Sequence, residues 1–194
     1  MNIDAGTAVP DRLAREISEV VTLGPAGTDA HNAARRFAKV RLVESFPVAM
    51  ETALRDSLAA LVPAGYIAHS GDTVTDSWVN LHFRYSGRMT LAGVWHEPTK
   101  PMCLATGHRS GSSPKELRTV ALHPATAVFL EKHAPNSAPR FVQAKPLAVE
   151  LARTGETDGC IGSVDLVRAT GTLRILKTFD AVMVWCLYLR SEDS

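Results

Sequence analysis

Residues 20–37 read VVTLGPAGTDAHNAARRF and contain, in order, the signals for a strand, a turn and a helix. The apolar run Val20–Leu23 is closed by Gly24-Pro25, which is typical of a buried strand. The residues from Asp29 to Lys39 are rich in alanine and carry apolar side chains at helical spacing, so they predict a helix. A strand that leads directly into a helix is the repeating unit of α/β proteins.

The same alternation continues along the chain. We expect further strands at 40–46, 60–63, 89–95, 101–105, 119–122, 140–143, 158–162, 173–179 and 182–189, and helices at 47–57, 72–83, 124–133, 146–153 and 164–169. Short loops between them favour a parallel α/β architecture. A break near residues 97–100 and a final return of the chain predict two hinged lobes, the first formed by about 1–98 plus 180–194 and the second by about 99–179. Hinged α/β lobes bind ligands in the cleft between them, at the carboxyl ends of strands.

Composition excludes several classes of function. With 21 Lys and Arg against 20 Asp and Glu, the chain of 194 residues has no bulk charge that would favour nucleic acid or an acidic membrane as partner. The three cysteines lie far apart without CxxC spacing, and the seven histidines form no HExxH motif, so we expect neither a disulfide framework nor a metal site. The N-terminal residues have no apolar signal core, and no apolar run reaches the roughly 18 to 20 residues that span a bilayer. We therefore expect a soluble, cytoplasmic protein.

Two turns between a strand and a helix are candidate sites. In Leu23–Thr28, Gly27 permits close backbone approach and Thr28 can cap the following helix, where N–H groups can hold a carboxylate or phosphate. A plain structural turn remains an equal alternative. In Leu122–Thr126, His123 stands at the end of a strand, where it can serve as an acid, a base or part of an anion site, or have only a structural role.

Two further segments carry polar groups after apolar strands. Lys177 can pair with a carboxylate and Thr178 can donate a hydrogen bond, although a solvated strand end is an alternative. Tyr66 follows Val62–Gly65 and either directs its hydroxyl into a cleft or buries its ring in the core. Because no GxSxG motif occurs, serine hydrolase chemistry is poorly supported.

Taken together, these segments resemble the prephenate dehydratase family. Val21–Phe37 is similar to its opening strand, GPxGT turn and Ala-rich helix, Leu61–Ser70 to its VPxENS segment, and Thr119–Leu130 to its SHPQAL segment. Residues 143–152 followed by 157–164 resemble the later helix and strand. The resemblance covers about residues 20–190 and implies one catalytic domain over 1–194 with a two-lobed, type 2 periplasmic-binding-protein-like fold.

The departures from the dehydratase pattern are informative. That family carries a TRF motif whose Thr is thought to act on the leaving hydroxyl, whereas Val184 or its neighbours stand at that place here. The ENS of its VPxENS segment is replaced by Ala64-Gly65-Tyr66, and no regulatory ACT domain is expected before the chain ends. These departures, with the segments Lys177–Phe179 and Met183–Trp185, resemble the non-aromatising prephenate decarboxylases of the bacilysin (anticapsin) type.

The resemblance implies a cofactor-independent lyase that releases carbon dioxide from prephenate and retains the ring hydroxyl, giving a dihydro-4-hydroxyphenylpyruvate in antibiotic biosynthesis. It assigns proton donation or hydroxyl binding to His123, Tyr66 and His31, and a positive charge to Lys177 or Lys100. Substrate binding falls to Gly27, Thr28, Lys100, Ala125, Thr126 and Thr178. A homodimer is favoured. The alternatives are a prephenate dehydratase and a non-catalytic module that binds small carboxylates.

Overall fold

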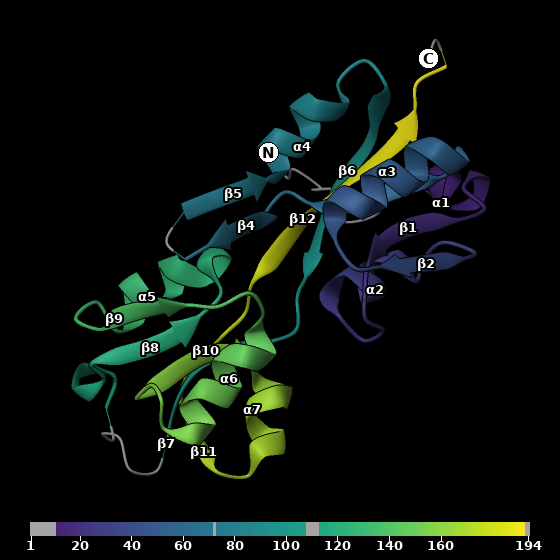
Figure 1. Cartoon of the computed structure of the whole chain (residues 1–194). Helices are drawn as coiled ribbons and strands as arrows, with labels where there is room; N and C mark the ends of the chain where they lie inside the picture. The colour runs from purple at the N-terminus through teal and green to yellow at the C-terminus, as the bar shows by residue number, and fades with distance from the viewer. Residues whose placement is uncertain (1–10, 72, 108–112, 193–194) are drawn as a thin grey trace, which may run out of the picture. The chain divides into compact units, whose positions relative to one another are not determined.

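The structure is a computed structural model that describes residues 11–71, 73–107 and 113–192. Most of the segment considered for a signal core, residues 1–10, lies outside this part. The chain divides into two compact units, which are described separately. Of the described residues, unit 1 comprises 11–66, 76–99 and 182–192, and unit 2 comprises 67–71, 73–75, 100–107 and 113–181 (Figure 1).

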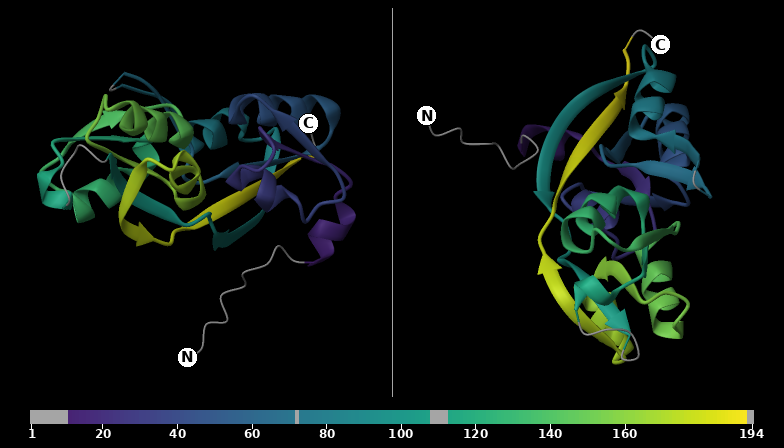
Figure 2. Two further views of the ribbon diagram at one scale, coloured as in Figure 1. Left: turned by 90° about the horizontal axis from the view of Figure 1, so that it is seen from below. Right: turned by 90° about the vertical axis from the view of Figure 1, so that its left-hand side faces the viewer.

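Unit 1 is built on a five-stranded mixed sheet. Its strands, in spatial order, are β2 (Val40–Val43), β1 (Val20–Leu23), β3 (Ala59–Pro63), β12 (Val182–Arg190) and β6 (Met89–Pro98). The inner strand β1 runs parallel to β2 and β3, whereas β12 runs antiparallel to β3 and β6. Figure 2 shows β12 and β6 running side by side. The associated helices are α1 (Asp11–Glu16), α2 (Asp29–Ala34), α3 (Phe46–Asp56) and α4 (Trp78–Tyr85).

Local capping fixes where the helices of unit 1 begin. The Thr28 hydroxyl accepts a hydrogen bond from the His31 N–H at 3.2 Å at the start of α2, and Ser45 does the same for Val48 at 3.3 Å at the start of α3. Such caps satisfy N–H groups that have no partner within the helix. Leu61 on β3 and Met50 on α3 are both fully buried in the unit 1 core, so the helix packs on the sheet through this apolar layer.

Unit 2 has a second five-stranded mixed sheet. Its strands are β11 (Leu173–Phe179), β7 (Met102–Gly107), β10 (Gly159–Ser163), β8 (Thr119–Leu122) and β9 (Ala138–Phe141). Strands β9, β8 and β10 are parallel, and β7 is antiparallel to both β10 and β11. One core cluster joins the sheet to α6 (Lys145–Thr154) and α7 (Val164–Thr170), and another joins it to α5 (Ala127–His133). The short helices η1 (Pro114–Glu116) and η2 (Pro124–Thr126) and the pair β4 (Ile67–Ser70) and β5 (Thr73–Ser77) complete the elements.

Two sequence predictions about the elements are wrong. The sheets are mixed, because strands that return along the chain, such as β12, insert antiparallel beside the parallel ones. Residues 72–83 do not form one helix: 73–77 form β5, where Thr73, Val74 and Thr75 favour a strand as β-branched residues. Helix α4 begins only after Ser77, whose hydroxyl accepts from the Asn80 N–H at 3.3 Å.

The division into units also differs from the expected lobes at residues 67–75, which lie with unit 2. One reason is a hydrogen bond from the Gln143 side-chain amide to the His69 carbonyl at 2.6 Å, which ties β4 to the end of β9. This contact brings a histidine of β4 next to the strand ends of unit 2.

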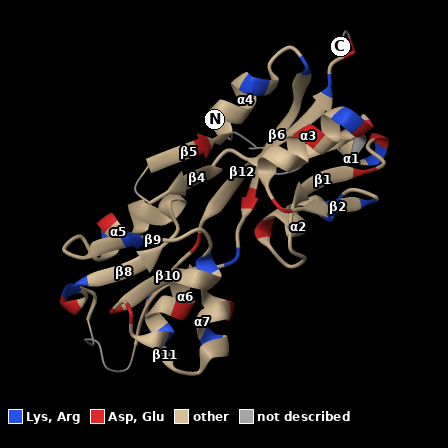
Figure 3. Ribbon diagram, viewed as in Figure 1, with Lys and Arg blue, Asp and Glu red and all other residues tan. Residues whose placement is uncertain are grey.

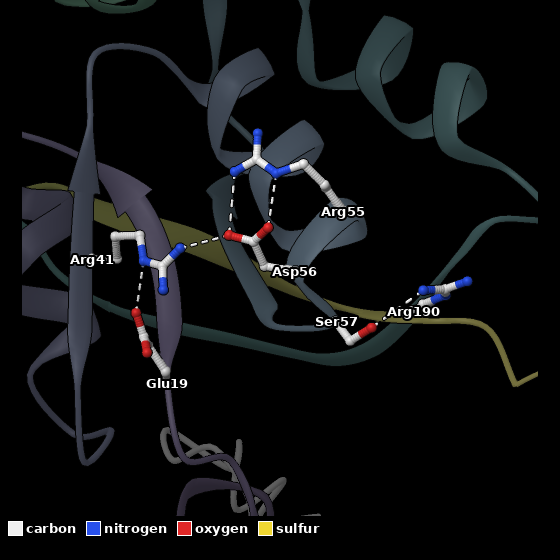
Figure 4. A network of polar contacts seen from close by, with 6 residues as sticks. All are labelled: Glu19, Arg41, Arg55, Asp56, Ser57 and Arg190. Carbon is white, nitrogen blue, oxygen red and sulfur yellow. Dashed lines mark hydrogen bonds and ion pairs between the residues drawn. The ribbon is translucent and has the colours of Figure 1, made fainter.

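Charged residues of both signs occur in each unit, as the colours of the ribbon show (Figure 3). A network in unit 1 links Glu19, Arg41, Asp56 and Arg55 by charge-assisted hydrogen bonds, with Arg41 donating at 2.7 Å to both carboxylates (Figure 4). It ties β2 to the start of β1 and the end of α3. In the described part of the chain, no helix is long and apolar enough to cross a membrane, and no three His, Cys, Asp or Glu side chains are grouped to hold a metal ion.

Candidate functional site

The turn between β1 and α2 carries three of the predicted residues. The Gly27 N–H donates to His31 Nδ1 at 3.0 Å, and the Thr28 hydroxyl donates to the Pro25 carbonyl at 3.0 Å while it caps α2. Because a backbone N–H can only donate, His31 Nδ1 acts as an acceptor, and the neutral ring carries its proton on Nε2. The turn therefore presents an imidazole N–H donor at the carboxyl end of a parallel strand.

Tyr66 lies on unit 1 after β3. Its ring packs edge-on against Phe46, with centroids 5.2 Å apart, and is partly buried against the core. Burial, and then the negative charge of Asp76, raise the pKa of the Tyr66 hydroxyl, so it is a protonated donor at neutral pH.

The two departures from the dehydratase motifs lie side by side in unit 1. The Ala64 N–H donates to the Val184 carbonyl at 2.8 Å, and a Cβ on Gly65 would lie only 3.1 Å from Met183 Sδ. Val184 is 40% exposed and Val182 59% exposed, so β12 begins with accessible apolar side chains. The resemblance expects hydroxyl, acidic and amide side chains in these two segments. They carry Ala, Gly, Met and Val instead.

In unit 2, the turn after β8 resembles the turn after β1 of unit 1, because in both a backbone N–H donates to a histidine Nδ1. The Ala125 N–H donates to His123 Nδ1 at 3.2 Å, so the neutral His123 ring carries its proton on Nε2. The buried Thr126 donates its hydroxyl to the His123 carbonyl at 2.6 Å. Burial, and then the neighbouring His69 and Lys145, lower the pKa of His123 to about 4. His123 is therefore a neutral Nε2–H donor at physiological pH.

A histidine that the sequence analysis did not select lies beside His123. His69 is 7% exposed, and its ring is edge-on to His123, with centroids 6.4 Å apart, and to Phe141 at 6.0 Å. Since β8 and β9 are parallel and pair Leu122 with Phe141, their carboxyl ends meet at this edge of the sheet. Such an edge is where open α/β sheets bind ligands.

The remaining predicted residues of unit 2 lie on other elements. Lys100 forms an ion pair with Asp165 at 2.8 Å, and this contact, together with the Ser163 hydroxyl, lowers the pKa of Asp165 to about 2. Lys177 and Thr178 are exposed on β11 and, being successive strand residues, point to opposite faces of the sheet. Lys177 is close enough to His133 on α5 to help lower the pKa of that ring, after the larger effect of burial.

Within unit 1, Gly27, Thr28 and His31 thus form one cluster, and within unit 2, His123, Ala125 and Thr126 form another that also contains His69. Lys100 contacts α7, and Lys177 lies near α5. The N–H groups of Gly27, Ala125 and Thr126, which the resemblance assigns to carboxylate binding, donate within their own turns. The roles of all these residues toward a substrate stay predictions.

Comparison with solved structures identifies the fold. The prephenate dehydratase of Arthrobacter aurescens matches with a TM-score of 0.56 and 15% identity over 89% of this chain and 60% of that one. The Staphylococcus aureus prephenate dehydratase matches with a TM-score of 0.51 and 12% identity over 90% and 68%. The periplasmic VFT2 domain of BvgS from Bordetella pertussis matches with 0.53 and 13% identity over 92% and 83%.

These likenesses establish the class of protein: the chain has the type 2 periplasmic-binding-protein-like fold, and the fold class expected from the sequence is confirmed. Prephenate dehydratases and periplasmic binding domains both have it, and the chain spans 60% of the length of the first dehydratase. No family model matches the chain, and a search of curated proteins gives no match.

Proposed function

We propose that the protein is a cofactor-independent lyase that removes carbon dioxide from prephenate without aromatising the ring. The observation that carries the proposal is the apolar pair of segments in unit 1. The Ala64 N–H donates to the Val184 carbonyl and Gly65 lies beside Met183, and the two segments occupy the places that the resemblance gives to the ENS and TRF motifs. A substrate hydroxyl that meets these side chains receives no acid to assist its departure.

The proposed reaction balances without an added reagent. The bond between the ring and its carboxylate breaks, and its electron pair passes into the ring diene. Carbon dioxide leaves, a ring carbon takes up a proton that comes from solvent water, and the hydroxyl remains. In a dehydratase the same electron pair expels the hydroxyl, so the two outcomes differ in assistance to that group. General-acid assistance is worth about 10² to 10⁴ in rate, so its loss redirects the product.

His123 in unit 2 is not suited to act as a general acid. Because its pKa is lowered to about 4, it is a neutral hydrogen-bond donor at pH 7. A positive charge for a carboxylate of the ligand falls, on this proposal, to Lys177 or Lys100.

Incubation of the protein with prephenate, followed by ultraviolet spectra and NMR, tests the proposal. A dihydro-4-hydroxyphenylpyruvate with loss of carbon dioxide is expected. Phenylpyruvate as the product means a dehydratase, and unchanged prephenate overturns catalysis on this substrate. Val184→Thr and Val182→Thr, at exposed positions of β12, add a hydroxyl where assistance is missing and should divert part of the product to phenylpyruvate.

A second candidate function is binding without turnover. It is favoured by the likeness of the fold to periplasmic binding domains, such as the VFT2 domain of BvgS. Thermal stabilisation by prephenate with no change in its spectrum would support this binding function against the lyase.

A further inference from the structure

His69 combines deep burial with a ring nitrogen that lacks a partner. Its Nδ1 lies 2.8 Å from the Gly71 carbonyl, and because a carbonyl only accepts, this nitrogen carries the proton. In the neutral ring Nε2 is then a lone-pair acceptor. Nε2 is buried and has no hydrogen-bond partner among the described residues, and His69 as a whole is only 7% exposed. An unpaired buried acceptor costs stability, so native proteins retain few of them.

His123 has the opposite arrangement. Its Nδ1 accepts from the Ala125 N–H, which leaves Nε2–H as a donor. The two rings are neighbours, with centroids 6.4 Å apart at 74°, and they make no direct hydrogen bond. Among the described residues, the His123 Nε2–H is thus a donor without a partner and the His69 Nε2 is an acceptor without a partner.

Three contacts hold His69 in this orientation. Gly71 fixes the ring through Nδ1, Phe141 packs edge-on against it, and Gln143 donates to its backbone carbonyl at 2.6 Å. Phe141 and Gln143 come from the carboxyl end of β9, next to the end of β8 that carries His123. A ring fixed on rigid elements loses little conformational freedom when it binds a ligand.

We propose that His69 and His123 form a donor–acceptor pair that binds a hydroxyl group of the ligand. A hydroxyl both donates and accepts, so it can give its proton to His69 Nε2 and accept from His123 Nε2–H. A carboxylate only accepts and an ammonium only donates, so either would leave one of the two nitrogens unpaired. The preference for an alcohol or phenol follows from the two rings alone and does not depend on the proposed function.

Two stable keto acids provide matched probes, because 4-hydroxyphenylpyruvate and phenylpyruvate differ only in one ring hydroxyl. Calorimetric titration should show that the wild-type protein binds the hydroxylated probe about fivefold more tightly, which is the range of one net hydrogen bond. In His69→Asn the amide can still donate to Gly71 but Nε2 is removed, so the preference should fall to about one. His69→Gln places a polar group near the position of Nε2 and should retain part of it.

His133→Phe is the matched control, since it removes an imidazole from unit 2 and preserves the stacking on Phe179. It should keep the wild-type preference. Thermal melting verifies that each variant is folded, and long-range ¹H–¹⁵N NMR of the wild-type imidazoles should find the proton of His69 on Nδ1 and that of His123 on Nε2.

The outcomes separate this inference from the proposed function. Equal binding of both probes by the wild type, binding of neither probe, or an undiminished preference in His69→Asn overturns the donor–acceptor pair, as do the opposite tautomers. A hydroxyl preference that depends on His69 in a protein that leaves prephenate unchanged supports the pair and rejects the lyase. Decarboxylation of prephenate with no effect of His69 on the hydroxyl preference supports the lyase and rejects the pair.

Discussion

Lowering the pH from 7 to 5 should destabilise the wild-type protein more than a His123→Asn variant. The pKa of His123 is lowered from its ordinary value of 6.5 to about 4, first by burial and then by the neighbouring His69 and Lys145. Between these two values the unfolded chain binds a proton on this ring and the folded chain does not. Stability that is fully present above pH 6.5 is therefore lost as the pH falls toward 4.

The size of this effect follows from the shift. Each pKa unit corresponds to about 1.36 kcal/mol, so the full difference is about 3 kcal/mol below pH 4, of which about 2 kcal/mol has developed between pH 7 and pH 5. His123→Asn removes this titration, and the Asn oxygen can replace Nδ1 as the acceptor for the Ala125 N–H, as it does in many helix caps. The variant should therefore lose about 2 kcal/mol less on acidification.

Urea denaturation of both proteins at pH 7 and pH 5 measures the difference. The slopes of the transitions must agree between proteins, because a changed slope signals a changed unfolded state. Equal losses in wild type and His123→Asn would refute the reasoning, as would an NMR titration in which His123 gains its proton near pH 6.5.

Three further predictions concern packing and charge. Leu61→Ala, at a fully buried position on β3, should lower the free energy of unfolding by about 2 to 5 kcal/mol in urea titrations, and a loss below 1 kcal/mol would contradict the assigned core. Lys100→Met should raise the pKa of Asp165 from about 2 toward its ordinary 3.8, as followed by carboxyl ¹³C NMR, and an unchanged titration would reject the ion pair. Gly159→Ala would place a Cβ 2.6 Å from the Ala105 carbonyl oxygen and should reduce the melting temperature by several degrees, whereas Gly93→Ala, with its nearest neighbour at 3.5 Å, should be tolerated better.

The features that the sequence predicted well depend on residues close together in the chain. The strand at 20–23 and the start of the helix after Thr28 follow from an apolar run, a turn and a capping hydroxyl, all within a few residues. The antiparallel insertion of β12 between β3 and β6 has no such local signal, because strand partners are chosen by tertiary packing. For the same reason the alternation of strands and helices could not distinguish a parallel from a mixed sheet.

The residues of the candidate site likewise divide into those with a local sequence signal and those without one. His123 could be selected because a histidine between an apolar strand and a Pro-started helix stands at a strand end. His69 could not be selected, because its relation to His123 depends on the Gln143 hydrogen bond that ties β4 to unit 2. A sequence search for paired histidines at short spacing misses a pair that only the fold brings together.

The state of His123 also bears on how one fold could support two reactions of prephenate. With its pKa lowered to about 4, His123 is predominantly neutral at pH 7, so it offers little acid assistance to a bound hydroxyl. On the proposed chemistry, an imidazole that is kept neutral can hold a hydroxyl in place while it suppresses its departure.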